Sequence, residues 1–351
     1  MYGRENLFMT RDIKYLLAYT GPISVIIGLY LQGLFFYSTV IYAYIMIPVL
    51  ELFINNQRDD DNFNESEKES RLKNKFFDLM LYFNLPLTFG VLAWGFSIIS
   101  FNSLETYEVI GLTISLGIVL SSNGINVAHE LGHRNNTIEK TLSKLLLIPS
   151  LYMHFYIEHN FGHHKNVATK EDPATAKKNQ SLYSFWITSV IGQYISAWKI
   201  QLKLLKQNNS SFFSVKNDML FYTLFQLLYL LMLYNFFGIF TLFIAVLVAI
   251  ISFLLLETIN YIEHYGLLRK KINGRYEKVQ TIHSWNSNHF VGRIVLYELT
   301  RHSDHHYRTS KKYQILENKK ESPQLPFGYP TSMLISMIPP LWYRVMNPRL
   351  V

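Results

Sequence analysis

Six long apolar runs divide the chain, and polar or turn-forming residues separate them. The runs cover residues 15–31, 34–54, 76–100, 109–127, 219–237 and 239–258. A helix needs roughly 20 apolar residues to cross a hydrocarbon core of about 30 Å, and each run is close to that length. Short turns near residues 32, 104 and 238 join the runs in pairs. The pattern predicts an all-α, polytopic membrane protein with six transmembrane helices in three hairpins.

The remaining segments are more polar and carry most of the charge. Residues 55–75 are rich in Asp, Asn, Glu and Lys, which predicts a surface loop. Two further apolar stretches, 141–157 and 182–200, are interrupted by polar residues, and Pro149 interrupts the first of them. They predict interfacial or partly buried helices. Residues 128–218 and 259–351 therefore form a cap on one side of the membrane, and residues 1–351 make a single domain.

The distribution of positive charge predicts the orientation. The chain carries 33 Lys and Arg against 25 Asp and Glu, and the three short turns contain no Lys or Arg. Positively charged loops stay on the cytoplasmic side. We therefore expect a multi-pass protein of the inner (cytoplasmic) membrane, with both termini and the cap facing the cytoplasm. The net charge of +8 follows from this topology, so nucleic-acid binding is not expected.

The candidate chemistry lies in the histidines of the cap. Three clusters and one separate histidine account for nine of the 12 histidines in the chain. They are His129, His133, His159, His163, His164, His264, His302, His305 and His306. Within each cluster the later histidines lie three to five residues after the first, and positions three or four apart share a helix face. Three helices could therefore direct imidazoles at a common point.

Neutral imidazole is a common metal ligand. Nine exceed the four that a tetrahedral zinc takes, but they are enough for two metals with open positions. The absence of cysteine excludes disulfides, thiolate sites and cysteine-bound iron–sulfur clusters. Four acids lie beside the histidines and could hydrogen-bond to ring N–H groups, holding the tautomers: Glu130, Glu158, Glu263 and Asp304.

Three histidines remain outside the clusters. For His154 we expect a packed, structural role, and for His289 a place that supports the site or its cap. His283 lies near His289, on the other side of Trp285.

The motifs that carry these histidines closely resemble those of the integral-membrane alkane 1-monooxygenases (alkane omega-hydroxylases), within the desaturase- and hydroxylase-like membrane di-iron proteins. They are His129-Glu-Leu-Gly-His133, Glu158-His-Asn-Phe-Gly-His-His164, Asn260-Tyr-Ile-Glu-His-Tyr-Gly-Leu267 and Arg301-His-Ser-Asp-His-His306. The segments 167–174 and 286–289 resemble that family too. The resemblance extends from about residue 123 to residue 316.

The resemblance implies that the nine histidines bind two non-haem iron ions, without saying how the irons share them. The implied reaction inserts one oxygen atom of O₂, the co-substrate, into the terminal methyl group of an n-alkane, giving a primary alcohol and water. The family takes the two electrons from rubredoxin, which an NADH-dependent rubredoxin reductase reduces. Rubredoxin iron needs four cysteines, so here we expect a separate carrier protein, an acidic one that docks on the basic cytoplasmic face.

Other functions stay open at this point. Xylene-type methyl monooxygenases share the motifs, and acyl-chain desaturases or hydroxylases are similar. The non-redox alternative is a membrane zinc protease, because His129-Glu-Leu-Gly-His133 fits its two-histidine signature with glutamate as base. The hydrophobic substrate would enter from the bilayer, and its chain length is open. Bulky side chains in the apolar runs could set the depth of a channel: Phe35, Phe36, Tyr42, Trp94 and Phe96.

Overall fold

A computed structural model describes residues 12–54 and 63–350 of the chain. Residues 1–11, part of the predicted loop at 55–62, and the last residue lie outside this description. The described chain is mostly helical, as the hydrophobic pattern predicts. Five helical stretches are long and apolar enough to cross a membrane: Ile13–Leu31, Gly33–Phe53, Lys75–Phe101, Thr106–Gly132 and Asp218–His264. The structure is that of an all-α membrane protein.

The five apolar stretches contain twelve of the helical elements. These are η1 (Ile13–Tyr19), α2 (Thr20–Leu31), η2 (Gly33–Tyr37), α3 (Ser38–Ile41), η3 (Tyr42–Met46), α4 (Ile47–Phe53), α6 (Lys75–Tyr82), α7 (Asn84–Phe101), α8 (Thr106–Val119), η4 (Leu120–Ile125), α9 (Asn126–Gly132) and α14 (Asp218–His264). Helix α5 (Glu65–Lys73) lies between the second and third stretches. The cap contains α10 (Thr137–Leu146), α11 (Phe155–Glu158), η5 (His159–His163), α12 (His164–Asn166), α13 (Leu182–Gln207), β1 (Lys271–Ile272), β2 (Arg275–Tyr276), η6 (Thr281–His283), α15 (Phe290–Val295), α16 (His302–Tyr307), η7 (Tyr313–Ile315), α17 (Tyr329–Ser336), α18 (Pro339–Met346) and η8 (Asn347–Arg349).

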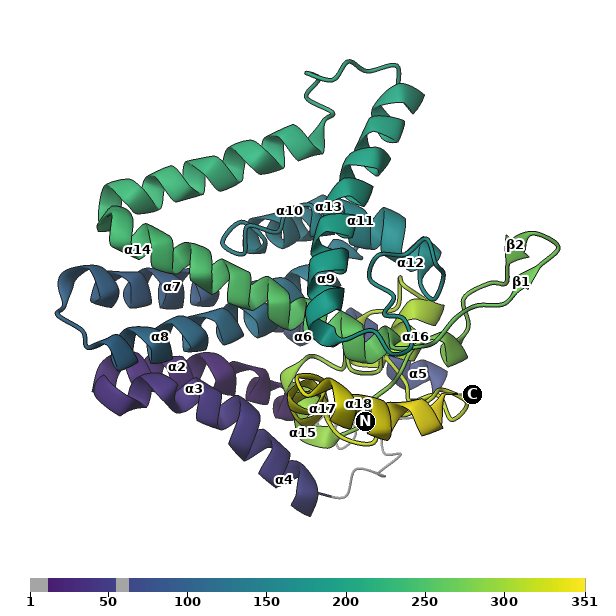
Figure 1. The fold of residues 1–351 in the computed structure, drawn as a ribbon, viewed down its shortest axis with the longest axis horizontal. Helices are drawn as coiled ribbons and strands as arrows, with labels where there is room; N and C mark the ends of the chain where they lie inside the picture. Colours follow the sequence, from purple (N-terminus) through teal and green to yellow (C-terminus); the bar gives the residue numbers. More distant parts are fainter. Residues whose placement is uncertain (1–11, 55–62, 351) are drawn as a thin grey trace.

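Helix α14 has 47 residues and reverses direction at Gly238, whose φ of 78° and ψ of 176° are not helical. Only glycine adopts such a conformation readily, because a Cβ atom would clash with the backbone. Figure 1 shows the two halves of α14 meeting at an acute angle. The turn expected near residue 238 is therefore present. The six-span count and the hairpin arrangement stay predictions.

The second half of α14 packs closely against α8. A Cβ atom on Gly117 would lie 2.5 Å from Cγ2 of Ile251, so glycine permits this approach. Leu112, Leu116 and Val248 form part of the same buried cluster. Lipid tails are as apolar as these side chains, so close van der Waals packing stabilises the contact between the two helices. This packing fixes the ends of α8–α9 and α14, where His129 and His264 lie.

One expectation for the polar segments is met in part and another is wrong. Residues 141–157 are helical at both ends: α10 ends at Leu146, and turns containing Pro149, the expected interruption, separate it from α11. Proline lacks the N–H group that a helix interior needs. The expected loop at 55–75 contains α5, which begins with a reciprocal capping box between Asn64 and Glu67.

Residues 182–200 do lie in a helix, α13, which crosses the apolar helices at a steep angle in Figure 1. Its buried positions include Phe185, Ser189, Gln193 and Ala197, four residues apart, so only one face of the helix packs on the protein.

A small β-hairpin, β1–β2, was not expected from the hydrophobic pattern. Its strands pair Lys271 with Tyr276 and Ile272 with Arg275. Asn273 and Gly274 form the turn with φ of 50° and 78°. Asn-Gly is the preferred dipeptide for such two-residue turns, so a signal was present in the sequence. The hairpin projects from the body of the molecule (Figure 1).

Candidate metal centre

Four parts of the chain bring the nine clustered histidines together. His129 lies in α9 and His133 follows its end, while His264 is the last residue of α14. The second cluster occupies η5 and the start of α12, and the third lies in α16. All nine come from helices that end at the same side of the apolar bundle.

The nine imidazoles form two groups, within each of which one ring nitrogen per residue lies within 4.8 Å of the others. Group one contains His129, His133, His159, His164 and His305. Group two contains His163, His264, His302 and His306. The imidazoles therefore converge on two adjacent points and not on one. The first sequence cluster contributes only to group one, whereas the second and third clusters each contribute to both groups.

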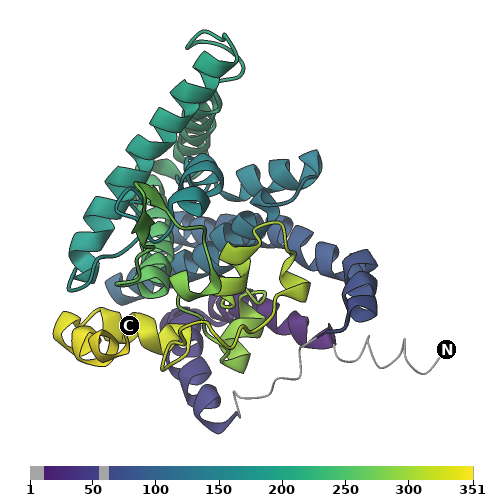
Figure 2. The same ribbon diagram turned by 90° about the vertical axis from the view of Figure 1, so that its right-hand side faces the viewer.

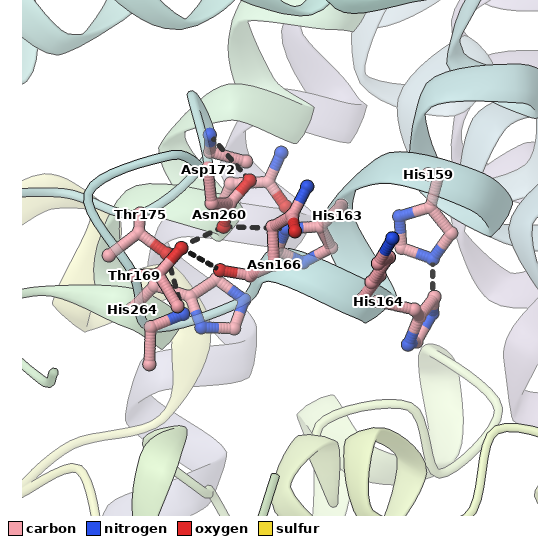
Figure 3. Close-up of polar contacts among 12 residues, drawn as sticks. His159, His163, His164, Asn166, Thr169, Asp172, Thr175, Asn260 and His264 are labelled. Carbon is pink, nitrogen blue, oxygen red and sulfur yellow. Dashed lines mark hydrogen bonds and ion pairs between the residues drawn. The ribbon is translucent and has the colours of Figure 1, made fainter. Parts of the chain in front are cut away.

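A π-helical turn, η5, divides the histidines of the second cluster between the two groups. The backbone N–H of His164 donates to the carbonyl of His159, five residues earlier, which is the π-helical pattern. The Nε2 atoms of these two histidines are 2.8 Å apart in group one. His163 belongs to group two. Its other ring nitrogen, Nδ1, contacts Asp172 (Figure 3). The i, i+4 pairing assumed from the sequence does not hold for His159 and His163.

The chemistry of the donor set fits metal ions. Nε2 atoms approach one another at 2.9 Å for His129 and His305, and at 3.1 Å for His264 and His302. Among the described residues, Nε2 of His163 and both ring nitrogens of His306 are buried without a hydrogen-bond partner. A buried unsatisfied group costs about 1–3 kcal/mol. Bound cations would satisfy these converging nitrogens.

Burial keeps most of these imidazoles neutral, which is the form that binds metals. It lowers the pKa of His305 to about 3. It also lowers the pKa of His159, His164, His302 and His306 well below the usual value. A neutral ring has a lone pair on one nitrogen and an N–H group on the other. These five imidazoles therefore each keep a lone pair available to a cation at neutral pH.

His163 is held differently, by Asp172. Burial acts to lower the pKa of His163, but the Asp172 carboxylate outweighs it and raises the pKa overall. Nδ1 of His163 donates to Oδ2 of Asp172 over 3.0 Å, and Thr175 and the N–H of Ala174 also donate to this carboxylate (Figure 3). Nε2 is then left facing group two. Sequence analysis missed this role, although Asp172 lies in the motif at 167–174.

The four predicted supporting acids differ in their contacts. Glu263 lies beside group two: its Oε2 is 3.1 Å from Nε2 of His302, and Tyr329 donates to its Oε1. Glu158 accepts from Ser196.

The other two acids bond to groups outside the histidines. Glu130 pairs with Arg134 at 2.8 Å and accepts from the backbone N–H of Tyr313. Asp304 pairs with Lys311 at 2.6 Å and accepts from the N–H of Glu317. The tautomer-holding role expected of these two acids has no support in their contacts.

The three other histidines lie outside both groups. His154 is buried against the rings of Tyr152 and Tyr194. His283 contacts Glu277 at 3.3 Å, and His289 contacts the hydroxyl of Ser287 at 3.0 Å.

An apolar cavity connects the apolar helices with the histidines. His129, His159 and His302 line one part of it, together with Glu263 and Asn260. Apolar side chains of α14, of the end of α15 and of the residue after it line another part: Leu255, Leu256, Ile259, Val295 and Leu296. Residues of the second apolar stretch, among them Thr39, Tyr42 and Ile47, complete the wall.

Of the five bulky residues predicted to set a channel depth, Tyr42 lines this cavity. Phe36 and Phe96 belong to a separate buried cluster, and Phe35 and Trp94 are exposed.

Comparison with known proteins places the chain. Alkane 1-monooxygenase of Ectopseudomonas oleovorans is 34% identical over 337 residues, which are 94% of this chain and 83% of that protein. Alkane 1-monooxygenase of Acinetobacter baylyi is 35% identical over 97% of this chain and 79% of that protein. The chain belongs to the alkane 1-monooxygenase family. The resemblance seen in the histidine motifs is therefore confirmed.

Alkane 1-monooxygenases are not the only relatives of the chain. A family model described as fatty acid desaturase matches residues 106–335, which contain all nine clustered histidines. The xylene/toluene monooxygenase hydroxylase component of Pseudomonas putida is 29% identical over 77% of this chain and 73% of that protein. The alkane 1-monooxygenases are more similar and cover more of the chain.

Proposed function

We propose that the protein is a membrane di-iron monooxygenase that hydroxylates the terminal methyl group of n-alkanes. One non-haem iron ion binds group one and the second binds group two. Imidazole suits iron, and five or four ligands leave positions open for exogenous molecules. The irons, when bound, supply the oxygen-activating redox chemistry that a saturated C–H bond requires. The close approach of the nine imidazoles and the lowered pKa of most of those in the cap support this assignment.

The reaction consumes O₂, two electrons and two protons for each alkane. One oxygen atom enters the C–H bond to give a primary alcohol, and the other leaves as water. The protein positions the methyl group and keeps water away from it. Asp172 holds the imidazole of His163 through Nδ1, and Tyr329 holds Glu263 beside His302. The buried acids also offset the positive charge of the bound metals.

The apolar cavity is the observation that carries the proposal. Its walls come from the apolar helices, and it reaches His129, His159 and His302. A hydrocarbon dissolved in the bilayer can bind there through van der Waals contacts alone, because an apolar cavity leaves no polar group unsatisfied when the hydrocarbon enters from lipid. The cavity thus brings a substrate without polar groups to the predicted metal ligands.

The remaining parts of the proposal follow from topology and composition. We place six spans in the inner membrane, with both termini, the cap and the histidines on the cytoplasmic side. Because the chain has no cysteine, a separate rubredoxin, reduced by an NADH-dependent rubredoxin reductase, supplies the electrons. The zinc-protease alternative has less support: Oε1 of Glu130 contacts Arg134 and accepts from the backbone N–H of Tyr313, and the two-histidine signature leaves the other seven clustered histidines without a role.

The test is conversion of octane to 1-octanol by the purified protein in lipid nanodiscs, with rubredoxin, reductase, NADH and O₂. We expect 1-octanol to accumulate and to depend on every component. p-Xylene and a saturated acyl substrate are assayed in parallel, because a xylene-type relative matches at 29% identity. Faster turnover of p-xylene than of any n-alkane from hexane to hexadecane would replace the alkane by an alkyl-aromatic substrate. Formation of a double bond in the acyl chain would replace hydroxylation by desaturation.

A further inference from the structure

The β1–β2 hairpin lies in the loop that follows α14, whose last residue is His264. In Figure 1 it extends away from the ends of the apolar helices, and Figure 2 looks onto the same face. The guanidinium of Arg269 donates to the carbonyl of Lys165 over 2.8 Å. Lys165 is the residue after His164. The backbone N–H of Arg269 donates to Ala168 over 2.7 Å, which makes a second link to the same loop.

The hairpin is also linked to group two and is internally braced. Its first strand begins seven residues after His264. The N–H of Glu277 donates to the carbonyl of Lys270, and Glu277 accepts from the N–H of Lys270 over 2.7 Å. With the Asn-Gly turn at its tip, the hairpin is a short, well-defined projection.

The surface of this projection is strongly basic. Residues 165–171 and 268–278 carry six exposed cationic side chains: Lys165, Lys170, Lys270, Lys271, Arg275 and Lys278. Two carboxylates lie in these ranges, Glu171, which is exposed, and Glu277, which is partly exposed. Leu268 and Ile272 are 55% and 59% exposed among the cations. Apolar contact residues within a charged rim are typical of a protein-docking surface.

We propose that this hairpin docks the acidic one-electron carrier protein that reduces the site. The inference rests on the proposed function, because only a redox reaction at the two groups needs a carrier. Two carrier molecules are each oxidised by one electron per alkane hydroxylated, and the two protons come from water. The path for electrons from the docking surface to His164 is short. It runs through Arg269 and its hydrogen bond to the carbonyl of Lys165, and the peptide chain then joins Lys165 directly to His164.

Charge complementarity selects the partner. Opposite charges raise association rates and make them dependent on ionic strength. An uncharged or basic carrier would gain nothing from six cations, whereas an acidic carrier would be oriented toward His164. Anionic lipid headgroups are the competing ligand, and the test below separates them.

The test uses the full-length protein in nanodiscs of zwitterionic lipid and, in parallel, of anionic lipid, with octane and varied concentrations of reduced rubredoxin. The double variant K271E/R275E changes two exposed hairpin residues. At low ionic strength we expect its KM for rubredoxin to rise about tenfold with kcat unchanged. The difference should shrink in 1 M salt, where the Debye length is about 3 Å.

The matched control is K73E/K75E, which changes two exposed lysines at the junction of α5 and α6 by the same charge. It should leave the KM for rubredoxin unchanged. Reduction by dithionite should proceed equally in wild type and K271E/R275E, which shows that the variant is folded.

Three outcomes would overturn the docking proposal: an unchanged KM in K271E/R275E, an equal rise in the control, or a rise seen only with anionic lipid. The last would assign the hairpin to lipid headgroups. Failure of the wild type to hydroxylate octane with any reductant would instead refute the proposed function.

Discussion

Asp172 shows how much of the site depends on single residues outside the histidine motifs. It accepts hydrogen bonds from His163, Thr175 and the backbone of Ala174, and it is buried. Such a carboxylate fixes the tautomer of its histidine and raises the basicity of the nitrogen that faces the metal. Glu263 occupies the other side of the group, beside His302.

Asp172→Asn should lower iron affinity by about 10- to 100-fold, because a neutral amide is a weaker acceptor for Nδ1–H than a carboxylate and raises the basicity of Nε2 less. Iron titration of the apoprotein measures the affinity. Thr175→Val is the control: it removes a hydrogen bond to Asp172 but leaves the contact of Asp172 with His163. His154→Ala, outside both groups, should keep its iron. Equal affinities in Asp172→Asn and wild type would contradict the role of Asp172.

At the scale of elements, the spacing of the histidines was readable from the sequence but their division was not. The i+3 and i+4 intervals predict shared helix faces, yet a π-helical turn at η5 pairs His159 with His164, five residues on. Three π-helical segments surround the cavity and histidines: η3, η4 and η5. A π-turn depends on tertiary packing and has no strong propensity signal. The hairpin, in contrast, was signalled by Asn273-Gly274 and overlooked.

Gly162→Ala should disturb η5. The new Cβ atom would lie 2.5 Å from Oε1 of Glu158 and 3.0 Å from Cδ1 of Ile200, in a buried site. We expect lower iron content and a lower Tm. Gly90→Ala is the control, because nothing lies within 4 Å of its Cβ position, and helix alanine stabilises by about 0.4–1 kcal/mol. Full iron content in Gly162→Ala would show that the π-turn tolerates displacement of Glu158.

Helix α5 is attached to the cap through Glu317. Its carboxylate contacts Lys68 at 2.7 Å, Lys319 at 2.9 Å and Lys311 at 3.0 Å. Partial burial acts to raise its pKa, but the three lysines outweigh it and lower the pKa from 4.5 to about 2. The ionised form is thus favoured by folding, so its stabilising effect is complete above pH 4.5 and is lost as the pH falls toward 2.

Glu317→Gln should therefore lower the Tm by a constant amount between pH 8 and about pH 5. The difference should decrease progressively below about pH 4.5. Thermal unfolding in detergent at a series of pH values measures it. A difference that grew on acidification would contradict the sign of the pKa shift.

At the scale of the whole molecule, the hydrophobic runs predicted the apolar helices well, because length and composition determine whether a helix can cross a bilayer. The reversal at Gly238 also followed from the sequence. The convergence of α9, η5, α14 and α16 did not, since it depends on packing between distant segments such as Gly117 against Ile251. The cavity and the role of Asp172 required the folded chain for the same reason.

The topology can be tested with single cysteines, because the chain has none of its own. S103C and N235C lie in or next to two predicted turns, and K320C lies in the cap; all three positions are exposed. In intact spheroplasts, a membrane-impermeant maleimide should label S103C and N235C. K320C should be labelled only after permeabilisation. Labelling of S103C and K320C from the same side would contradict the predicted orientation.

The central claim is that nine histidines form two iron sites, and elemental analysis of the purified protein tests it most directly. We predict about two irons per chain in the wild type and a loss of iron in His163→Ala and His302→Ala, with both variants still inserted in the membrane. About one zinc and no iron per chain would contradict the claim and would return attention to His129, Glu130 and His133.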